Sequence, residues 1–235
     1  MGFDFAADFW DNTRVNPILK RTLTGIAVGA AVIAAILLAP RSAIAPAVSC
    51  LIFLAVLEFT MLLAKKIRQI GAFLFALVWL VGVSVIACGL WALAEMAMRH
   101  GNVMLLYVVA IVKFSDVGGF AFGTASAKLM AGGNHKMCPA ISPGKSWEGL
   151  FGSLVFSCVV SCAFVPATGF PIGKAVVFGV VAALVGTAGD LVESKFKRWI
   201  GVKDSSALKI TNGLGGVLDM LDSLIIASAV LLGMI

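Results

Sequence analysis

Charged residues are scarce in this sequence. Lysine, arginine, aspartate and glutamate make up 13% of its 235 residues, whereas hydrophobic residues make up 60%, and the mean hydropathy is +1.04. Soluble domains usually carry about 25% charged residues. This composition therefore excludes an ordinary soluble protein and predicts an integral membrane protein.

Several features of other protein classes are also missing. No segment has the composition of a disordered linker, no internal repeat is visible, and no run of short alternating segments suggests a membrane β-barrel. The first twenty residues contain no apolar core, so we expect no cleavable signal peptide. The five cysteines, an odd number, fit neither a disulfide framework nor a metal motif and are expected to be small packing residues.

Long hydrophobic runs, in contrast, are abundant. Each is close to the roughly 20 apolar residues that a bilayer requires, and backbone groups in lipid are best satisfied within helices. We therefore predict an all-α fold, a polytopic transmembrane helix bundle of about seven spans. The predicted spans are 22–40, 46–64, 70–96, 103–122, 148–166, 174–194 and 214–235.

One membrane domain is expected over residues 1–235. Residues 1–100 read as scaffold spans, because Glu58 is the only acid deep within them. Polar residues and glycines enter the helices from Lys113 onward, so we expect the catalytic region at 105–230.

Basic residues are unevenly distributed between alternate loops. Fourteen of the eighteen lie in the N-terminal lead or in the loops 65–69, 123–147 and 195–213, whereas the opposite loops hold only Arg41, Arg99 and Lys174. The positive-inside rule then predicts a cytoplasmic N-terminus and a C-terminus on the far side of a cell inner membrane. A simpler interpretation, anchoring to anionic lipid, explains many of these residues but not the acids beside them.

Two pairs of acids lie within predicted spans. Asp190 with Glu193, and Asp219 with Asp222, are three residues apart, so each pair shares one helix face. A charged group in the bilayer costs about 2.5 kcal/mol or more, and persists only when it is paired, binds a metal or faces a water-filled cavity. The pairs flank a basic segment, 195–209. Together they predict a site at which bound cations help to hold a polyanionic ligand.

A polar, glycine-rich segment, KFSDVGGFAFG, ends the fourth predicted span. Asp116 is followed by Gly118 and Gly119, which allow close approach of a ligand or of another helix. The alternative is an internal Lys113–Asp116 salt bridge beside a small-residue packing face.

The motif ISPGKSWEG precedes the fifth predicted span. Ser142–Gly144 reads as a turn, Ser146 as the N-cap of a helix and Glu148 as an acid in its first turn. Lys145 would stand beside a helix N-terminus, where free N–H groups favour phosphate. A capped helix start with an interfacial Trp147 is the alternative.

The segment GDLVESKFKRWIGVKDSS ends the sixth predicted span. Its acids suit a divalent ion, and the basic residues Lys197 and Arg198 suit phosphate oxygens. An interfacial amphipathic helix with i,i+4 pairs is the alternative.

In the last span, NGLGGVLDMLDS places Asp219 and Asp222 where they could form a Mg²⁺ site with Asp190.

Together these segments resemble the phosphatidate cytidylyltransferase (CDP-diacylglycerol synthase) family over roughly residues 105–230. The resemblance rests on four ordered motifs with matching spacing. They are Asp116-Val117-Gly118-Gly119; Ser142-Pro143-Gly144-Lys145-Ser146-Trp147-Glu148-Gly149; Gly189-Asp190-Leu191-Val192-Glu193-Ser194 with Lys197-Arg198 and Lys203-Asp204-Ser205; and 213–223, which ends Asp219-Met220-Leu221-Asp222-Ser223.

The resemblance implies transfer of the cytidylyl group of CTP to phosphatidic acid, with Mg²⁺ and a helper cation such as K⁺. It implies Asp190, Asp219 and Asp222 as metal ligands, and Lys197 and Arg198 as catalytic groups holding phosphate. The expected substrate-binding residues are Asp116, Ser142, Lys145, Ser194, Lys203, Asp204 and Lys209. The implied partners are the two substrates and membrane lipid, with no nucleic acid; a homodimer is one arrangement left open.

Two positions depart from the family pattern. Leu214 stands where the pattern has His, and Met220 stands where it has Arg. Both changes remove a group that could contact phosphate, and Lys209 is the nearest basic residue that could replace one. A degenerate, non-catalytic paralogue is therefore an alternative. An ion-coupled transporter is a weaker alternative, because the acids gather near one end of the spans.

Overall fold

The computed structural model describes residues 29–202 and 216–235. The chain forms two compact units, residues 1–38 and 39–235. The described part of the first unit is one apolar helix, Gly29–Leu38, which is shorter than a membrane span. The expectation of one domain over 1–235 stays a prediction.

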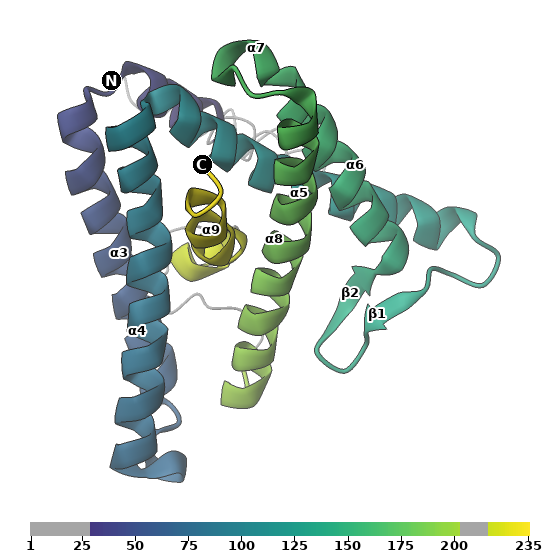
Figure 1. The fold of residues 1–235 in the computed structure, drawn as a ribbon. Coiled ribbons are helices and arrows are strands. Elements are labelled where there is room, and N and C mark those ends of the chain that lie inside the picture. Colours follow the sequence, from purple (N-terminus) through teal and green to yellow (C-terminus); the bar gives the residue numbers. More distant parts are fainter. Residues whose placement is uncertain (1–28, 203–215) are drawn as a thin grey trace, which may run out of the picture. The chain divides into compact units, whose positions relative to one another are not determined.

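The second unit is built from helices and one small hairpin (Figure 1). Its elements, in chain order, are α3 (Arg41–Ala64), α4 (Ile67–His100), α5 (Asn102–Leu129), β1 (Lys136–Cys138), β2 (Ser142–Ser146), α6 (Trp147–Ala163), α7 (Val165–Thr168), α8 (Ile172–Ile200) and α9 (Val217–Leu232).

Helices α3, α4, α5 and α8 are long and apolar enough to cross a membrane. The prediction of a helical membrane bundle is thereby confirmed for the described residues, but the count of about seven spans is not. Helix α6, with 17 residues, and α9, with 16, occupy segments predicted to span and are shorter than expected. Helix α8 continues to Ile200, so Lys195, Lys197 and Arg198 lie on a helix and not in the predicted loop 195–213.

The hairpin corrects two expectations. The fold is not purely α-helical, because β1 and β2 pair antiparallel, with Lys136 opposite Ser146 and Cys138 opposite Ser142. The predicted turn at Ser142–Gly144 was wrong, since these residues belong to β2 and the chain reverses just before them. A proline is tolerated at position 143 because a two-stranded sheet consists only of edge strands.

Small residues bring the helices close together. A methyl carbon on Gly118 of α5 would lie 2.5 Å from the carbonyl oxygen of Gly152 on α6, and one on Gly152 would lie 2.5 Å from that of Gly118. On α8, a methyl carbon at Gly189 would lie 2.9 Å from the carbonyl oxygen of Asp222 on α9. Both contacts lie beside predicted site residues, so tight backbone packing positions the carboxylates.

Helix α9 packs against both α4 and α8, and α6 packs against α5 and α8. Figure 1 shows α9 in the interval between α4 and α8. The core that joins these helices is apolar and includes the fully buried Leu90, Ile111, Phe178 and Leu231. Against this background the buried polar side chains are few among the described residues, and several of them, including Ser146, Thr187 and Glu193, belong to the site described next.

Candidate functional site

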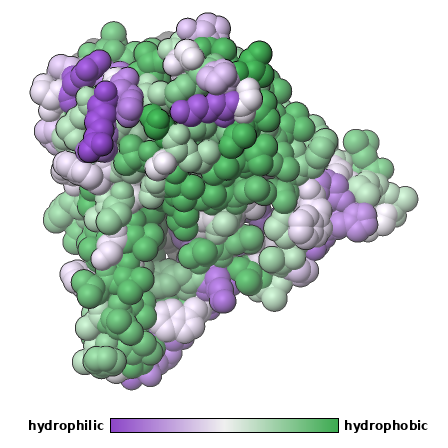
Figure 2. All heavy atoms as spheres, viewed as in Figure 1, coloured by the Kyte–Doolittle hydropathy of each residue, from purple (hydrophilic) through white to green (hydrophobic). Residues whose placement is uncertain are grey.

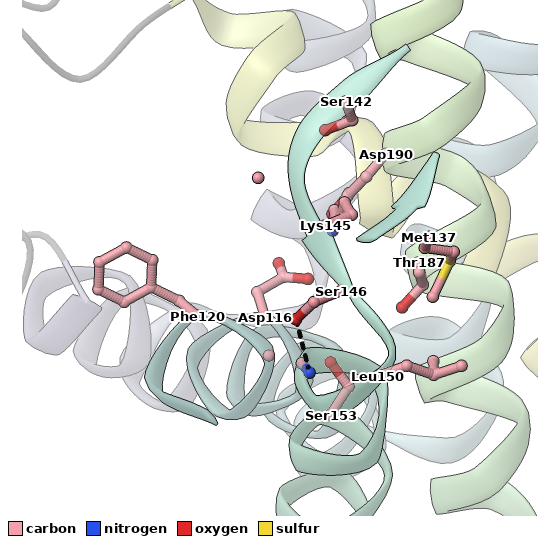
Figure 3. A pocket seen from close by; sticks show the side chains of 13 residues that line it. Asp116, Phe120, Met137, Ser142, Lys145, Ser146, Leu150, Ser153, Thr187 and Asp190 are labelled. Carbon is pink, nitrogen blue, oxygen red and sulfur yellow. Dashed lines mark hydrogen bonds and ion pairs between the residues drawn. The ribbon is translucent and has the colours of Figure 1, made fainter. Parts of the chain in front are cut away.

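A polar cavity of about 240 Å³ opens where α5, the hairpin, α6 and α8 meet. Figure 3 shows side chains from all of these elements around it. Its polar lining residues are Asp116, Ser142, Lys145, Ser146, Ser153, Thr187 and Asp190.

Local structure at the start of α6 positions Lys145. Ser146 is the N-cap residue, as predicted, and its Oγ accepts a hydrogen bond of 3.1 Å from the N–H of Gly149. The hairpin is tied to the same helix end, because the N–H of Trp147 donates to the carbonyl of His135 and Nδ1 of His135 lies 2.6 Å from the Glu148 carboxylate. Lys145 is therefore held on a short strand directly before a helix N-terminus.

Lys145 forms an ion pair with Asp190 of α8, 45 positions away in the sequence. The Asp190 side chain is 16% exposed. Its second oxygen, Oδ1, is buried and has no hydrogen-bond partner among the described residues. An unsatisfied buried carboxylate oxygen is costly, so a donor or a cation at this point would be stabilised.

Asp116 belongs to a second polar contact. Its Oδ2 lies 3.2 Å from Nζ of Lys113 and accepts a 2.9 Å hydrogen bond from Oγ of Ser223 on α9. Lys113 also donates to Ser223 Oγ at 3.0 Å. The structure therefore contains both the salt bridge of one interpretation and the close approaches of the other. Gly118 packs on α6, and Asp116 and Gly119 line the polar cavity.

A third group of charges joins α8 to α9. Nζ of Lys197 lies 2.9 Å from Glu193 and 2.8 Å from Asp219. Asp219 also accepts a 3.1 Å hydrogen bond from the N–H of Gly216, the N-cap residue of α9. Asp222 lies near enough to Asp190 and Glu193 to interact electrostatically with both, so it links this group to the polar cavity.

Among the described residues, five carboxylates and three lysines thus lie near one another within a largely apolar bundle, and four of the carboxylates pair with a lysine. The acids are Asp116, Asp190, Glu193, Asp219 and Asp222, and the bases are Lys113, Lys145 and Lys197. When every group is ionised, negative charge is in excess. Such a cluster attracts cations, and its lysines can contact an anion that arrives with them.

The residues present fit a magnesium ion delivered with phosphate. Among the described residues, no group of three or more His, Cys, Asp or Glu side chains is arranged to hold a metal ion unaided. Mg²⁺ usually takes only one or two protein carboxylates and completes its shell with phosphates and water. Asp190 and Glu193 each have a carboxylate oxygen with no hydrogen-bond partner among the described residues, and carboxylate oxygens are the ligands that Mg²⁺ prefers.

The structure brings most of the predicted site residues into two neighbouring groups. Asp116, Ser142, Lys145 and Asp190 line the polar cavity, and Lys197, Asp219 and Asp222 lie at the contact between α8 and α9.

The remaining predicted site residues lie elsewhere. Arg198 is exposed and donates from Nε to the carbonyl of Ile141 at 3.4 Å, at the tip of the hairpin. Ser194 is partly exposed and does not line the polar cavity. Lys203, Asp204, Lys209 and Leu214 fall outside the described residues.

Sequence reasoning missed four polar groups of the site. Glu193 was left out of the ligand set although it shares Lys197 with Asp219, and Ser153, Thr187 and Ser223 were not assigned a role. Helical spacing offered a signal for two of them. Thr187 precedes Asp190 by three residues, and Ser153 follows Ser146 by about two turns.

Comparison with known proteins agrees with the motif analysis. The sequence model of the family described as "Cytidylyltransferase family" matches residues 83–235. A phosphatidate cytidylyltransferase of Haemophilus influenzae is 40% identical over 136 residues, which are 53% of this chain and 43% of that protein.

Two further relatives match longer segments. A phosphatidate cytidylyltransferase of Staphylococcus aureus is 37% identical over 170 residues, 72% of this chain and 60% of that protein. One of Mycobacterium bovis is 34% identical over 163 residues, 68% of this chain and 48% of that protein. The chain therefore spans only about half the length of the curated relatives that it matches.

Proposed function

Because the chain belongs to the cytidylyltransferase family, we propose that it transfers the cytidylyl group of CTP to phosphatidic acid, giving CDP-diacylglycerol and pyrophosphate. The observation that carries this proposal is the polar cavity in which Lys145 meets Asp190 at the edge of an apolar helix bundle. A nucleotide needs such a polar pocket, and a lipid needs access from the surrounding helices. The relatives that share these motifs are named for the same reaction.

The proposed reaction is an in-line displacement at phosphorus. An oxygen of the phosphatidate phosphate attacks the α-phosphorus of CTP and forms the new P–O bond. The bond from the α-phosphorus to the bridging oxygen breaks, and pyrophosphate leaves with the electron pair. No general base is needed, because the attacking phosphate oxygen is already anionic, so catalysis depends on positioning and charge stabilisation.

The residues of this chain supply those two functions in the proposal. Lys145 and the hydroxyl of Ser142 would hold phosphates of the nucleotide. Lys197 would hold a phosphate at the contact between α8 and α9. Asp190, Asp219 and Asp222 would hold Mg²⁺, with one or two of them as direct ligands beside phosphate oxygens and water, and the ion would neutralise phosphate charge when it is bound. A K⁺ ion is proposed as a second cation of the same cluster.

The lysines also have a role before substrate arrives. In the structure Lys145 and Lys197 contact the carboxylates that are proposed to bind metal. An incoming metal–nucleotide complex carries both signs of charge, so the carboxylates can exchange lysine for the cation while the lysines move to phosphate. Asp190 and Asp219 thereby have a positive partner both before and after the complex binds.

The proposal includes a location and an orientation. Four long apolar helices and membrane-enzyme relatives indicate a membrane protein. We infer that it lies in the cell inner membrane with its N-terminus and its site cytoplasmic, because fourteen of eighteen basic residues lie in the N-terminal lead or in segments that the sequence assigns to that side, including the end of α8.

An assay with purified protein tests the activity. Protein in detergent micelles, phosphatidate, Mg²⁺ and radiolabelled CTP should give a labelled chloroform-soluble product, and replacing CTP with ATP should give none. The Asp190→Asn protein, prepared identically, provides the matched background. Absence of a labelled lipid above that background would rule out the proposed activity.

A second candidate, a degenerate paralogue, is favoured by Leu214 and Met220, which replace the His and Arg of the family pattern. Loss of one charged hydrogen bond to phosphate costs about 1.5–3 kcal/mol, or about ten- to a hundredfold in rate. In a working enzyme, Lys209→Ala should therefore lower activity severely, and Met220→Arg should restore part of it. No turnover until Leu214→His and Met220→Arg are introduced together would establish the paralogue instead.

A further inference from the structure

A second cavity, of about 430 Å³, lies between α4 and α8, with α9 forming part of its wall. It is larger than the polar cavity and almost entirely apolar. Its hydrophobic lining includes Phe59, Leu77, Val81, Val85, Phe196 and Ile226, and its acidic lining residues are Glu193 and Asp222. The reaction chemistry described above uses none of the apolar residues.

The position of this cavity is within the depth of the bilayer. Both α4 and α8 are long enough to cross a membrane, and the α4 residues of the lining belong to the interior of that helix. Leu77, Val81 and Val85 recur every four residues, form one stripe on α4 and are 48%, 55% and 46% exposed. Figure 2, viewed like Figure 1, shows hydrophobic side chains over most of this face of the molecule.

The cavity adjoins the charged site at one place on α8. Gly189 and Glu193 line the apolar cavity, whereas the intervening Asp190 lines the polar one. Glu193 is 8% exposed, and its Oε1 has no hydrogen-bond partner among the described residues. Asp222 also lines the apolar cavity and interacts with Asp190. A molecule in this cavity would therefore touch hydrocarbon along its length and the cation-binding carboxylates at one end.

We propose that this cavity holds an acyl chain of the lipid phosphate substrate, whose phosphate then lies at the Asp190–Asp222 carboxylates. The identity of the lipid rests on the proposed function. Water is a poor occupant because the walls offer almost no polar partners, and a nucleotide is excluded for the same reason. An amphiphile with a flexible apolar tail and a cation-bound head satisfies both the apolar walls and the unpartnered Glu193 oxygen.

Filling the cavity tests the proposal through chain-length preference. Val81→Trp places a large side chain in the cavity, whereas Leu80→Trp, at a neighbouring α4 residue that is 60% exposed and does not line it, is the matched control. For dioleoyl phosphatidate, kcat/KM of Val81→Trp should fall about tenfold, and for dioctanoyl phosphatidate less than about twofold. Leu80→Trp should keep the wild-type ratio between the two lipids. An unchanged ratio in Val81→Trp, or an equal change in both variants, would overturn the assignment.

A binding experiment separates this inference from the proposed reaction. Wild-type protein is irradiated with a phosphatidate that carries a diazirine near the end of one acyl chain, and the labelled peptides are identified by mass spectrometry. Label on α4 at 77–85 or on α9 at 225–226, competed by unlabelled dioleoyl phosphatidate, supports the acyl-chain site even if no CTP is turned over. Label confined to other lipid-facing segments, or label that is not competed, refutes it even if the enzyme is active.

Discussion

The three lysines of the site each contact a side chain supplied by another element. Lys145 of β2 meets Asp190 of α8, Lys197 of α8 meets Asp219 of α9, and Lys113 of α5 meets Ser223 of α9. Each contact joins two elements that are far apart in the sequence, so the charges of the site also tie the helices and the hairpin to each other.

Neutralising the carboxylates should abolish activity with little loss of packing. Asp190→Asn, Asp219→Asn and Asp222→Asn each keep the side-chain shape but remove a charge that is proposed to bind the cation. We expect each to lower CTP turnover by at least about a hundredfold, the upper range for a lost charged contact, while the protein still inserts and purifies. The radiolabelled assay at saturating Mg²⁺ measures the rate.

A half-buried acid outside the site provides the control for these three variants. Glu95 pairs with Arg99 one helical turn away on α4, with Arg99 largely exposed. Because neither residue lines the polar or the apolar cavity, Glu95→Gln should keep near wild-type turnover. If two of the three aspartate variants match Glu95→Gln in rate, the cluster is not the catalytic metal site.

At the scale of secondary-structure elements, α3 contributes a polar contact that fixes the start of α9. Glu58 is fully buried, and its Oε2 accepts a 2.8 Å hydrogen bond from the N–H of Leu218 in the first turn of α9. Helix N-termini present free N–H groups and a partial positive charge, which a carboxylate satisfies. Glu58 therefore fixes the start of the helix that carries Asp219 and Asp222.

Removing this acceptor should destabilise the protein. Glu58→Ala leaves the Leu218 N–H without its buried acceptor, a loss of about 1–3 kcal/mol. Glu58→Gln keeps an acceptor oxygen and should lose less. Thermal unfolding in detergent, followed by size-exclusion chromatography, should rank wild type above Glu58→Gln and Glu58→Gln above Glu58→Ala. Equal unfolding temperatures for the alanine variant and wild type would contradict this role.

The crossing of α5 and α6 should be intolerant of even one methyl group. In Gly152→Ala the new carbon would lie 2.5 Å from the Gly118 carbonyl oxygen, so the helices must separate. Overpacking of this kind costs about 1–3 kcal/mol, and it shifts β2 and Lys145 at the start of α6. The same unfolding measurement should show a clear decrease.

Gly173→Ala on α8 is the matched control, because its methyl group meets nothing within 4 Å. Alanine is favoured over glycine in helices by about 1 kcal/mol, so this variant should equal or exceed wild type in stability. A Gly152→Ala protein as stable as Gly173→Ala would show that the close contact between α5 and α6 can relax without cost.

These contacts show what the sequence could and could not reveal. The i,i+3 spacing of Asp219 and Asp222 and the N-cap at Ser146 depend on neighbouring residues, so both were predictable from local pattern. The Glu58–Leu218 hydrogen bond joins residues 160 positions apart, and no periodicity identifies it. The hairpin was hidden because Pro143 and Gly144 favour a turn in isolation and form a strand only through pairing with β1.

At the scale of the whole molecule, the two ends of α4 carry basic residues that the sequence assigned to opposite sides of the membrane. Lys66, in the connection between α3 and α4, donates to the carbonyl of Trp199 near the end of α8, at 2.6 Å. At the other end of α4, Glu95 pairs with Arg99, and Arg41 approaches Gly101. Residues that the sequence assigned to opposite sides of the membrane thus lie at opposite ends of α4.

Cysteine labelling tests this orientation. In a protein whose five native cysteines are replaced, Pro143→Cys places an exposed thiol on the hairpin and Ala167→Cys places one on α7. Helix α6 between them has 17 residues, or about 25 Å at 1.5 Å per residue, against a hydrocarbon core of about 30 Å. It can separate the two positions only if its ends lie near the two membrane surfaces.

In intact spheroplasts an impermeant maleimide should label Ala167→Cys, and Pro143→Cys should react only after the membrane is opened. Labelling of both thiols from one side would show that α6 does not span, and labelling in the reverse order would place the site on the outer face.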